Sequence, residues 1–123
     1  YGGWWQRSGE GAVAQVRHVL DSQPPQVLAV ISNCCDPNDF AWYEGLMAGW
    51  DSGELQDERL YWTVGVHPYG ADGYEKWLAE DPDILDRMLK LAAHPRCVAI
   101  GECGLDYCKA YESYEAQRRV FAQ

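Results

Sequence analysis

Two short motifs place chemically useful side chains directly after apolar runs rich in branched residues. The first, VGVHP (64–68), presents His67, and the proline that follows turns the chain away and fixes the imidazole at the end of the run. The second, IGECGLDY (100–107), places Glu102 between two glycines and is followed closely by Asp106. An imidazole in such a position can bind a metal, contact an anion or move a proton, and carboxylate oxygens suit divalent ions. A buried carboxylate is costly unless a cation compensates it, although a structural histidine and a salt-bridged glutamate stay open as alternatives.

Strands must position these motifs, and the chain has three apolar runs of suitable length: 26–33, 60–67 and 97–102. The runs are nearly continuous rather than alternating, which is typical of parallel strands covered on both faces. Helical patterns alternate with the runs and cover 12–20, 40–50, 81–94 and the chain from about residue 111. The polar stretches 51–58 and 70–73 are predicted to be loops. This alternation of helices and strands predicts an α/β fold with a parallel sheet.

Polar or reactive side chains follow every predicted strand: Asn33 and Asp36, then His67, then Glu102 and Asp106. In β/α barrels and in doubly wound sheets, ligands bind at the carboxyl ends of the strands. We therefore expect a functional site at this edge of the sheet.

Composition limits the classes of function. Apolar residues make up 47% of the 123 positions, which suits a packed core and excludes wholesale disorder. Lysine and arginine number 10 against 19 acidic residues, a net charge of −9, so general cationic attraction cannot hold nucleic acid, and a local site or a bound metal would be required. No apolar run is long enough to span a membrane. The five cysteines, an odd number without a C-x-x-C pair, indicate reduced, buried thiols and a cytosolic-type compartment.

The two motifs together resemble the TatD family of metal-dependent deoxyribonucleases. VGVHP is followed about thirty residues later by VAIGECGLDY (98–107), and Gln117 with Phe121 resembles the family's Q-x-x-x-F at the start of the next helix. The resemblance covers about residues 10 to 123. It implies that 1–123 is a single, incomplete segment of an amidohydrolase-like (β/α)8 TIM-type barrel, about its first half, with parallel strands and outer helices. Such a barrel takes about 250 residues.

By this resemblance, Glu102 matches a carboxylate that bridges divalent metal ions, expected to be two and to be Mg, Mn or Zn. His67 matches a pocket histidine that contacts the substrate phosphate or a metal ligand, and Asp106 matches an aspartate that supports the site. No residue of the chain is assigned a catalytic role. The family's His-x-His after the first strand is absent, and its later ligands would lie beyond Gln123, so the chain alone is expected to be inactive.

The resemblance implies a hydrolase, specifically a nuclease, whose complete form cleaves DNA phosphodiester bonds with metal-activated water. It further implies a cytoplasmic or nuclear location, no membrane association and no obligate protein partner. Two alternatives stay open: a metal-dependent hydrolase of a small ester, amide or lactone, and a non-catalytic half-barrel interaction module. Tyr69, which follows HP where many relatives carry a polar residue, leaves substrate detail undefined.

Overall fold

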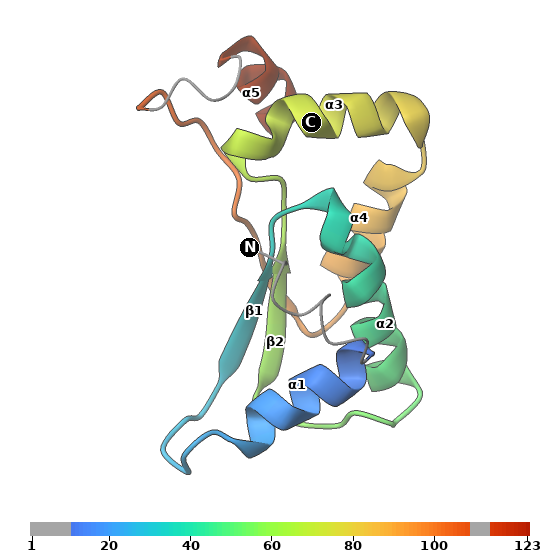
Figure 1. Ribbon diagram of the computed structural model, residues 1–123, viewed down its shortest axis with the longest axis vertical. Helices are drawn as coiled ribbons and strands as arrows, with labels where there is room; N and C mark the ends of the chain where they lie inside the picture. The colour runs from blue at the N-terminus through green and yellow to red at the C-terminus, as the bar shows by residue number, and fades with distance from the viewer. Residues whose placement is uncertain (1–10, 109–113) are drawn as a thin grey trace.

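The computed structural model of the chain describes residues 11–108 and 114–123. One sheet contains the three parallel strands in the order β1 (Val30–Cys34), β2 (Leu60–Val64) and β3 (Cys97–Ile100). Cys34 pairs with Val64, which in turn pairs with Ile100, so the three strands end in register. Figure 1 shows β1 and β2 running side by side in the same direction. The predicted α/β fold with parallel strands is confirmed, and the arrangement fits part of a (β/α)8 barrel.

Five α-helices accompany the sheet within the described residues: α1 (Ala12–Asp21), α2 (Phe40–Asp51), α3 (Ala71–Glu80), α4 (Ile84–Ala93) and α5 (Tyr114–Phe121). Short 3-10 turns, η2 (Pro37–Asp39) and η3 (Pro68–Gly70), lead into α2 and α3. The helices predicted at 12–20, 40–50 and 81–94 are confirmed with small differences at their ends. The expected start of the last helix near residue 111 lies outside the described residues.

Helix α3 was not predicted, because 70–73 was interpreted as a polar loop. The structure starts the helix at Ala71, and the apolar residues Ala71, Tyr74, Trp77 and Leu78 recur at helical spacing. A Cβ added at Gly73 would meet no other atom within 4 Å, so no close contact requires glycine at this position of the helix. The element order therefore has two consecutive helices, α3 and α4, between β2 and β3.

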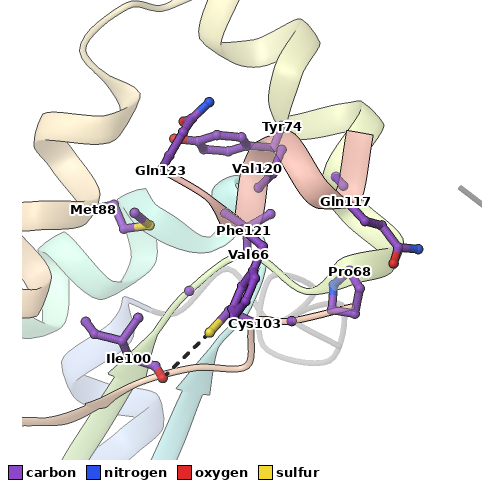
Figure 2. Close-up of a pocket in the computed structure, with 13 residues that line it drawn as sticks. Val66, Pro68, Tyr74, Met88, Ile100, Cys103, Gln117, Val120, Phe121 and Gln123 are labelled. Atoms are coloured by element: carbon purple, nitrogen blue, oxygen red, sulfur yellow. Dashed lines mark hydrogen bonds between the residues drawn. The ribbon is translucent and has the colours of Figure 1, made fainter. Parts of the chain in front are cut away.

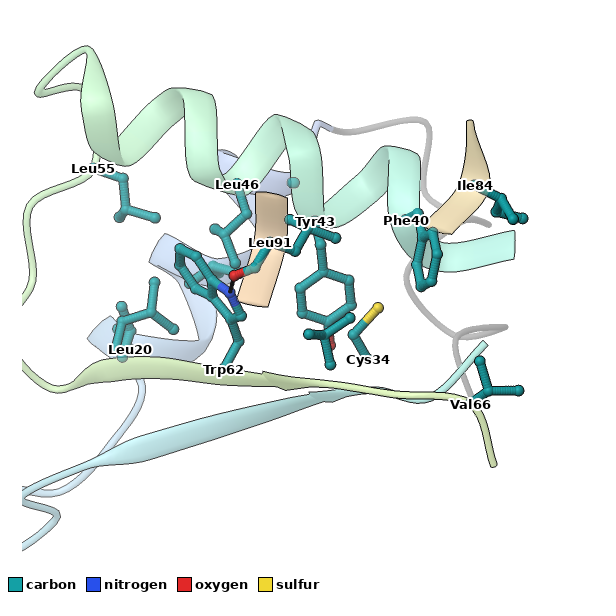
Figure 3. Close-up of a cluster of buried hydrophobic side chains, with 14 of the residues drawn as sticks. Leu20, Cys34, Phe40, Tyr43, Leu46, Leu55, Trp62, Val66, Ile84 and Leu91 are labelled. Carbon is teal, nitrogen blue, oxygen red and sulfur yellow. Dashed lines mark hydrogen bonds between the residues drawn. The ribbon is translucent and has the colours of Figure 1, made fainter. Parts of the chain in front are cut away.

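The hydrophobic core lies between one face of the sheet and the helices. Side chains of β2 alternate, so that Leu60, Trp62 and Val64 are buried against the helices. Among the described residues, Trp62 is the largest fully buried side chain, and its indole N–H donates to the carbonyl of Leu91 on α4 at 3.2 Å. Figure 3 shows α2 lying over the sheet with Leu46 and Trp62 between them. This packing holds the sheet as a rigid platform below the strand ends.

The opposite face of the sheet is open within the described residues, so the prediction that both faces are covered is wrong for this part of the chain. Ile31 on β1 is 55% exposed and Asn33, two residues on, is exposed as well. In a closed barrel this face is the interior. A continuous apolar run in the sequence therefore does not show whether the described residues cover one face of the sheet or both.

The cysteines only partly follow the prediction. All five are free thiols in the structure; Cys34 is buried and Cys35 and Cys97 are half-buried, but Cys103 and Cys108 are exposed. None of the helices in residues 11–108 and 114–123 has the length and apolar character that crossing a bilayer requires.

Candidate site at the carboxyl ends of the strands

Backbone hydrogen bonds extend the sheet beyond the ends of its strands and align the two motifs. Gly65 donates to the carbonyl of Cys34 at 2.9 Å, His67 donates to the carbonyl of Cys35 at 3.0 Å, and Gly101 donates to the carbonyl of Val64 at 2.9 Å. A Cβ at Gly65 would lie 2.7 Å from the Glu102 carbonyl oxygen, so only glycine allows the two chain segments to come this close. The predicted convergence of the strand ends is thus confirmed.

His67 and Glu102 face each other at this edge of the sheet. Nε2 of His67 lies 3.5 Å from Oε2 of Glu102, with the two side chains 24% and 60% exposed. The distance exceeds that of an ordinary hydrogen bond, and the exposed carboxylate of Glu102 is accessible from solvent. Residues from two different motifs therefore meet in one accessible place.

The proton on His67 can be assigned from its contacts. His67 caps η3, and its Nδ1 accepts the backbone N–H of Tyr69 at 3.1 Å. The neutral imidazole consequently carries its proton on Nε2, the nitrogen that faces Glu102. In this form Nε2 donates a hydrogen bond and does not bind a metal. Of the three roles considered from the sequence, contact with an anionic oxygen fits this geometry best.

The exposure of Glu102 removes one argument made from the sequence. A buried carboxylate would have required a compensating cation, but this side chain is 60% exposed and needs none for its own solvation. Nearby, burial raises the pKa of the Cys35 thiol, so this group stays protonated at neutral pH and is a poor metal ligand.

A metal ion would find one anionic ligand here. Within residues 11–108 and 114–123, no group of three or more His, Cys, Asp or Glu side chains is arranged to hold an ion. Catalytic ions are ordinarily held by three or more protein ligands. Glu102 fits the role of one such ligand, but the described residues do not make a complete metal site.

Asp106 is connected to the His67–Glu102 pair through Tyr69. Its Oδ2 accepts the hydroxyl of Tyr69 at 2.6 Å, and its Oδ1 accepts the backbone N–H of Cys108 at 2.8 Å. The buried side-chain amide of Gln117 accepts from the Asp106 N–H at 2.8 Å and donates to its carbonyl at 3.0 Å. Asp106 thus joins α5 to the loop after β3, and its role in supporting the site stays a prediction.

A cavity of about 230 Å3 with several polar side chains in its lining adjoins His67 on the side away from β3. Its lining includes Asn33, Asp36 and His67, three of the residues that follow the predicted strands, together with Asp39 and Tyr69. Burial, followed by the repulsion of Asp36, raises the pKa of Asp39. Asp39 and Tyr69 were not singled out from the sequence as site residues, and only their closeness to the strand ends could have indicated them.

A second cavity, of about 190 Å3, lies among α3, α5 and the ends of β2 and β3, as Figure 2 shows. Its walls are mostly apolar and include Val66, Tyr74, Met88, Val120 and Phe121. It offers no charged group to a phosphate, so we place the candidate site at the His67–Glu102 edge instead.

His94 and the paired arginines of α5 do not belong to the site. His94 precedes β3, and its Nε2 lies 2.7 Å from Asp51 at the opposite edge of the sheet, where it has a structural contact. On α5, Arg118 pairs with Glu115 and Arg119 pairs with Glu75. These ion pairs make a solvated helix surface.

Three parallel strands in one open sheet, flanked by helices, define the class to which this chain belongs: α/β proteins whose sheet fits part of a barrel. The profile of one family, TatD related DNase, matches residues 14–123. The chain is therefore a member of the TatD family, which confirms the resemblance inferred from the two motifs.

Individual relatives match over shorter stretches. The chain is 41% identical over 59 residues to the 3'-5' ssDNA/RNA exonuclease TatD of Escherichia coli (strain K12), covering 48% of this chain and 20% of that protein. It is 38% identical over 68 residues to the protein of the same name from Pantoea vagans, covering 55% of this chain and 24% of that protein. The matched stretches thus span about a fifth to a quarter of these relatives.

Proposed function

We propose that the full-length protein carrying this chain is a metal-dependent nuclease that hydrolyses phosphodiester bonds in DNA. The observation that carries the proposal is the His67–Glu102 pair, with Nε2 and Oε2 3.5 Å apart at the strand ends of a TatD-family chain. The named exonuclease activity of the relatives on ssDNA or RNA supports this substrate class and extends it to RNA.

In this proposal Glu102 supplies one carboxylate ligand to divalent ions, expected to be two and to be Mg, Mn or Zn. Such ions would activate water and stabilise the charge that develops on the phosphate. They would also offset the negative charge of a chain whose net charge is −9, which opposes a polyanionic substrate. Because Glu102 is a single ligand, residues 1–123 by themselves are expected to be inactive.

His67 has a separate part in the proposal. Its Nε2–H points at the space beside Glu102 and can donate to a non-bridging phosphate oxygen held there. Asp106 does not touch substrate in this scheme, because both of its carboxylate oxygens already accept hydrogen bonds within the chain.

The test uses the full-length gene product with end-labelled single-stranded DNA and RNA of one sequence, in the presence of Mg²⁺ or Mn²⁺ and again with a chelator. We expect metal-dependent cleavage that falls at least about a hundredfold in Glu102→Gln and about ten- to a hundredfold in His67→Ala. Glu54→Gln is the matched control, since this exposed glutamate lies in the loop that enters β2 at the opposite edge. Cleavage that survives in Glu102→Gln would refute the assignment.

The same preparation separates the alternatives. Hydrolysis of a small ester or lactone without nucleic-acid cleavage would favour the small-molecule hydrolase. Neither activity, together with a stable complex with another protein, would favour the interaction module. Cytoplasmic or nuclear location, the absence of a protein partner and the single domain over 1–123 stay predictions that fractionation and limited proteolysis can address.

A further inference from the structure

We propose that Tyr69 is a positioning residue that holds His67 in its donor orientation through a bond to Asp106. The proposal rests on the proposed function for what His67 does, but it concerns a residue that the TatD motifs do not define. Tyr69 stands directly after VGVHP, in the turn η3 that leaves β2.

Tyr69 contacts His67 in two ways. Its backbone N–H donates to Nδ1 of His67 at 3.1 Å, which leaves the proton of the neutral ring on Nε2. Its phenol ring packs against the imidazole with the ring centroids 4.7 Å apart and an angle of 67° between the planes. The edge-on contact restricts rotation of the imidazole, so Nε2 stays directed at Glu102.

The hydroxyl of Tyr69 reaches across to the other motif. It donates to Oδ2 of Asp106 at 2.6 Å, a short bond between a neutral donor and a carboxylate, which is stronger than a bond between two neutral groups. This contact joins the loop after β2 to the loop after β3, which carries Glu102. The separation between His67 and Glu102 depends on how these two loops are held relative to each other.

Asp106 can serve as a fixed anchor because it is held independently of Tyr69. The side-chain amide of Gln117, a residue that is 1% exposed, binds both the backbone N–H and the carbonyl of Asp106. The backbone N–H of Cys108 donates to the second carboxylate oxygen of Asp106. The hydroxyl of Tyr69 donates its hydrogen bond to Asp106 and is therefore not directed at a substrate. Tyr69 therefore acts through His67 rather than on the reacting atoms.

The test compares variants of the full-length protein. Tyr69→Phe keeps the ring and the backbone N–H but removes the bond to Asp106. We expect it to lower kcat/KM for phosphodiester cleavage about tenfold, because small displacements of a positioned group reduce rates strongly. In a His67→Ala background the same change should cost less than about twofold, since the residue it positions is gone.

Tyr61→Phe is the matched control. Tyr61 lies near the start of β2, the strand that leads to η3, and its ring packs on the guanidinium of Arg96 at 4.1 Å from the ring centroid, away from the site. This variant should leave kcat/KM unchanged in both backgrounds. If Tyr69→Phe does not fold, Asp106→Asn tests the same bond from its other side.

A nitrogen-15 spectrum of the His67 ring provides a readout that does not require activity. The wild-type ring should show Nε2 protonated and Nδ1 as acceptor. Tyr69→Phe keeps the N–H that donates to Nδ1, but the turn that carries it is no longer tied to Asp106, so this bond should weaken and both signals should shift part of the way toward the average of the two tautomers. An unchanged spectrum, or an equal loss of activity with and without His67, would overturn the inference. A wild-type protein that cleaves no phosphodiester would contradict the proposed function, and the spectrum alone would then decide the role of Tyr69.

Discussion

Replacing Gly65 by alanine should force the ends of β2 and β3 apart. The added Cβ would lie 2.7 Å from the carbonyl oxygen of Glu102 and 3.0 Å from the carbonyl carbon of Gly101. Both obstacles are backbone atoms, so no side chain can rotate away. The nearer contact must lengthen by about 0.7 Å to reach ordinary van der Waals distance. Overpacking of this kind typically costs about 1–3 kcal/mol, and we expect the upper half of that range.

The measurement is urea unfolding of the full-length protein, with Gly73→Ala as the control. Gly73 lies in α3 with no other atom within 4 Å of the added Cβ, so alanine should stabilise the helix by up to about 1 kcal/mol. The two glycine-to-alanine changes are therefore predicted to have opposite signs. A Gly65→Ala protein whose free energy of unfolding stays within about 0.5 kcal/mol of wild type would refute the close approach of the two strand ends.

Three further changes probe the supports around the site. Gln117→Leu leaves the backbone N–H and carbonyl of Asp106 without their partners and should cost about 2–4 kcal/mol of unfolding free energy in urea; a loss below about 1 kcal/mol would contradict the hydrogen bonds assigned to Gln117. Trp62→Phe removes the indole bond to α4 and part of the core and should cost about 1–3 kcal/mol in the same assay, whereas an unchanged midpoint would show that the indole is not buried as described. The hydrogen bond from Arg59 lowers the pKa of Asp57, so the stability from this pair is present above the pKa of the unfolded state and is lost as pH falls through the lower, folded value. The small stability difference between wild type and Asp57→Asn should accordingly shrink between about pH 5 and pH 3, and a difference that grows in this range would reverse the assigned sign.

The sequence predicted the strands well because their signal is local. Each run of apolar branched residues is continuous, and each forms a strand of the one parallel sheet. The run at 26–33 was nevertheless predicted as one strand. Pairing begins only at Val30, whose N–H donates to the backbone carbonyl of Arg59, the residue before β2. Strand bounds depend on the partner, which the local pattern does not contain.

The site was predicted in outline but not in its contacts. Parallel order alone brings His67 and Glu102 to one edge, so their meeting followed from the motifs. The exposure of the Glu102 side chain did not follow from the motifs. The apolar strand before it suggested burial, but Glu102 lies beyond Ile100, the last residue of β3. The bond between Tyr69 and Asp106 joins residues far apart in the chain and becomes visible only when both loops are placed.

Direct measurement of metal binding tests the central claim, that Glu102 holds a catalytic divalent ion beside His67. Mn²⁺ titration of the full-length protein, followed by electron paramagnetic resonance, compares wild type with Glu102→Gln and with the control Glu54→Gln. The account predicts Mn²⁺ binding in wild type and in the control, and affinity weakened at least about tenfold in Glu102→Gln. Equal Mn²⁺ affinity in all three proteins would contradict it.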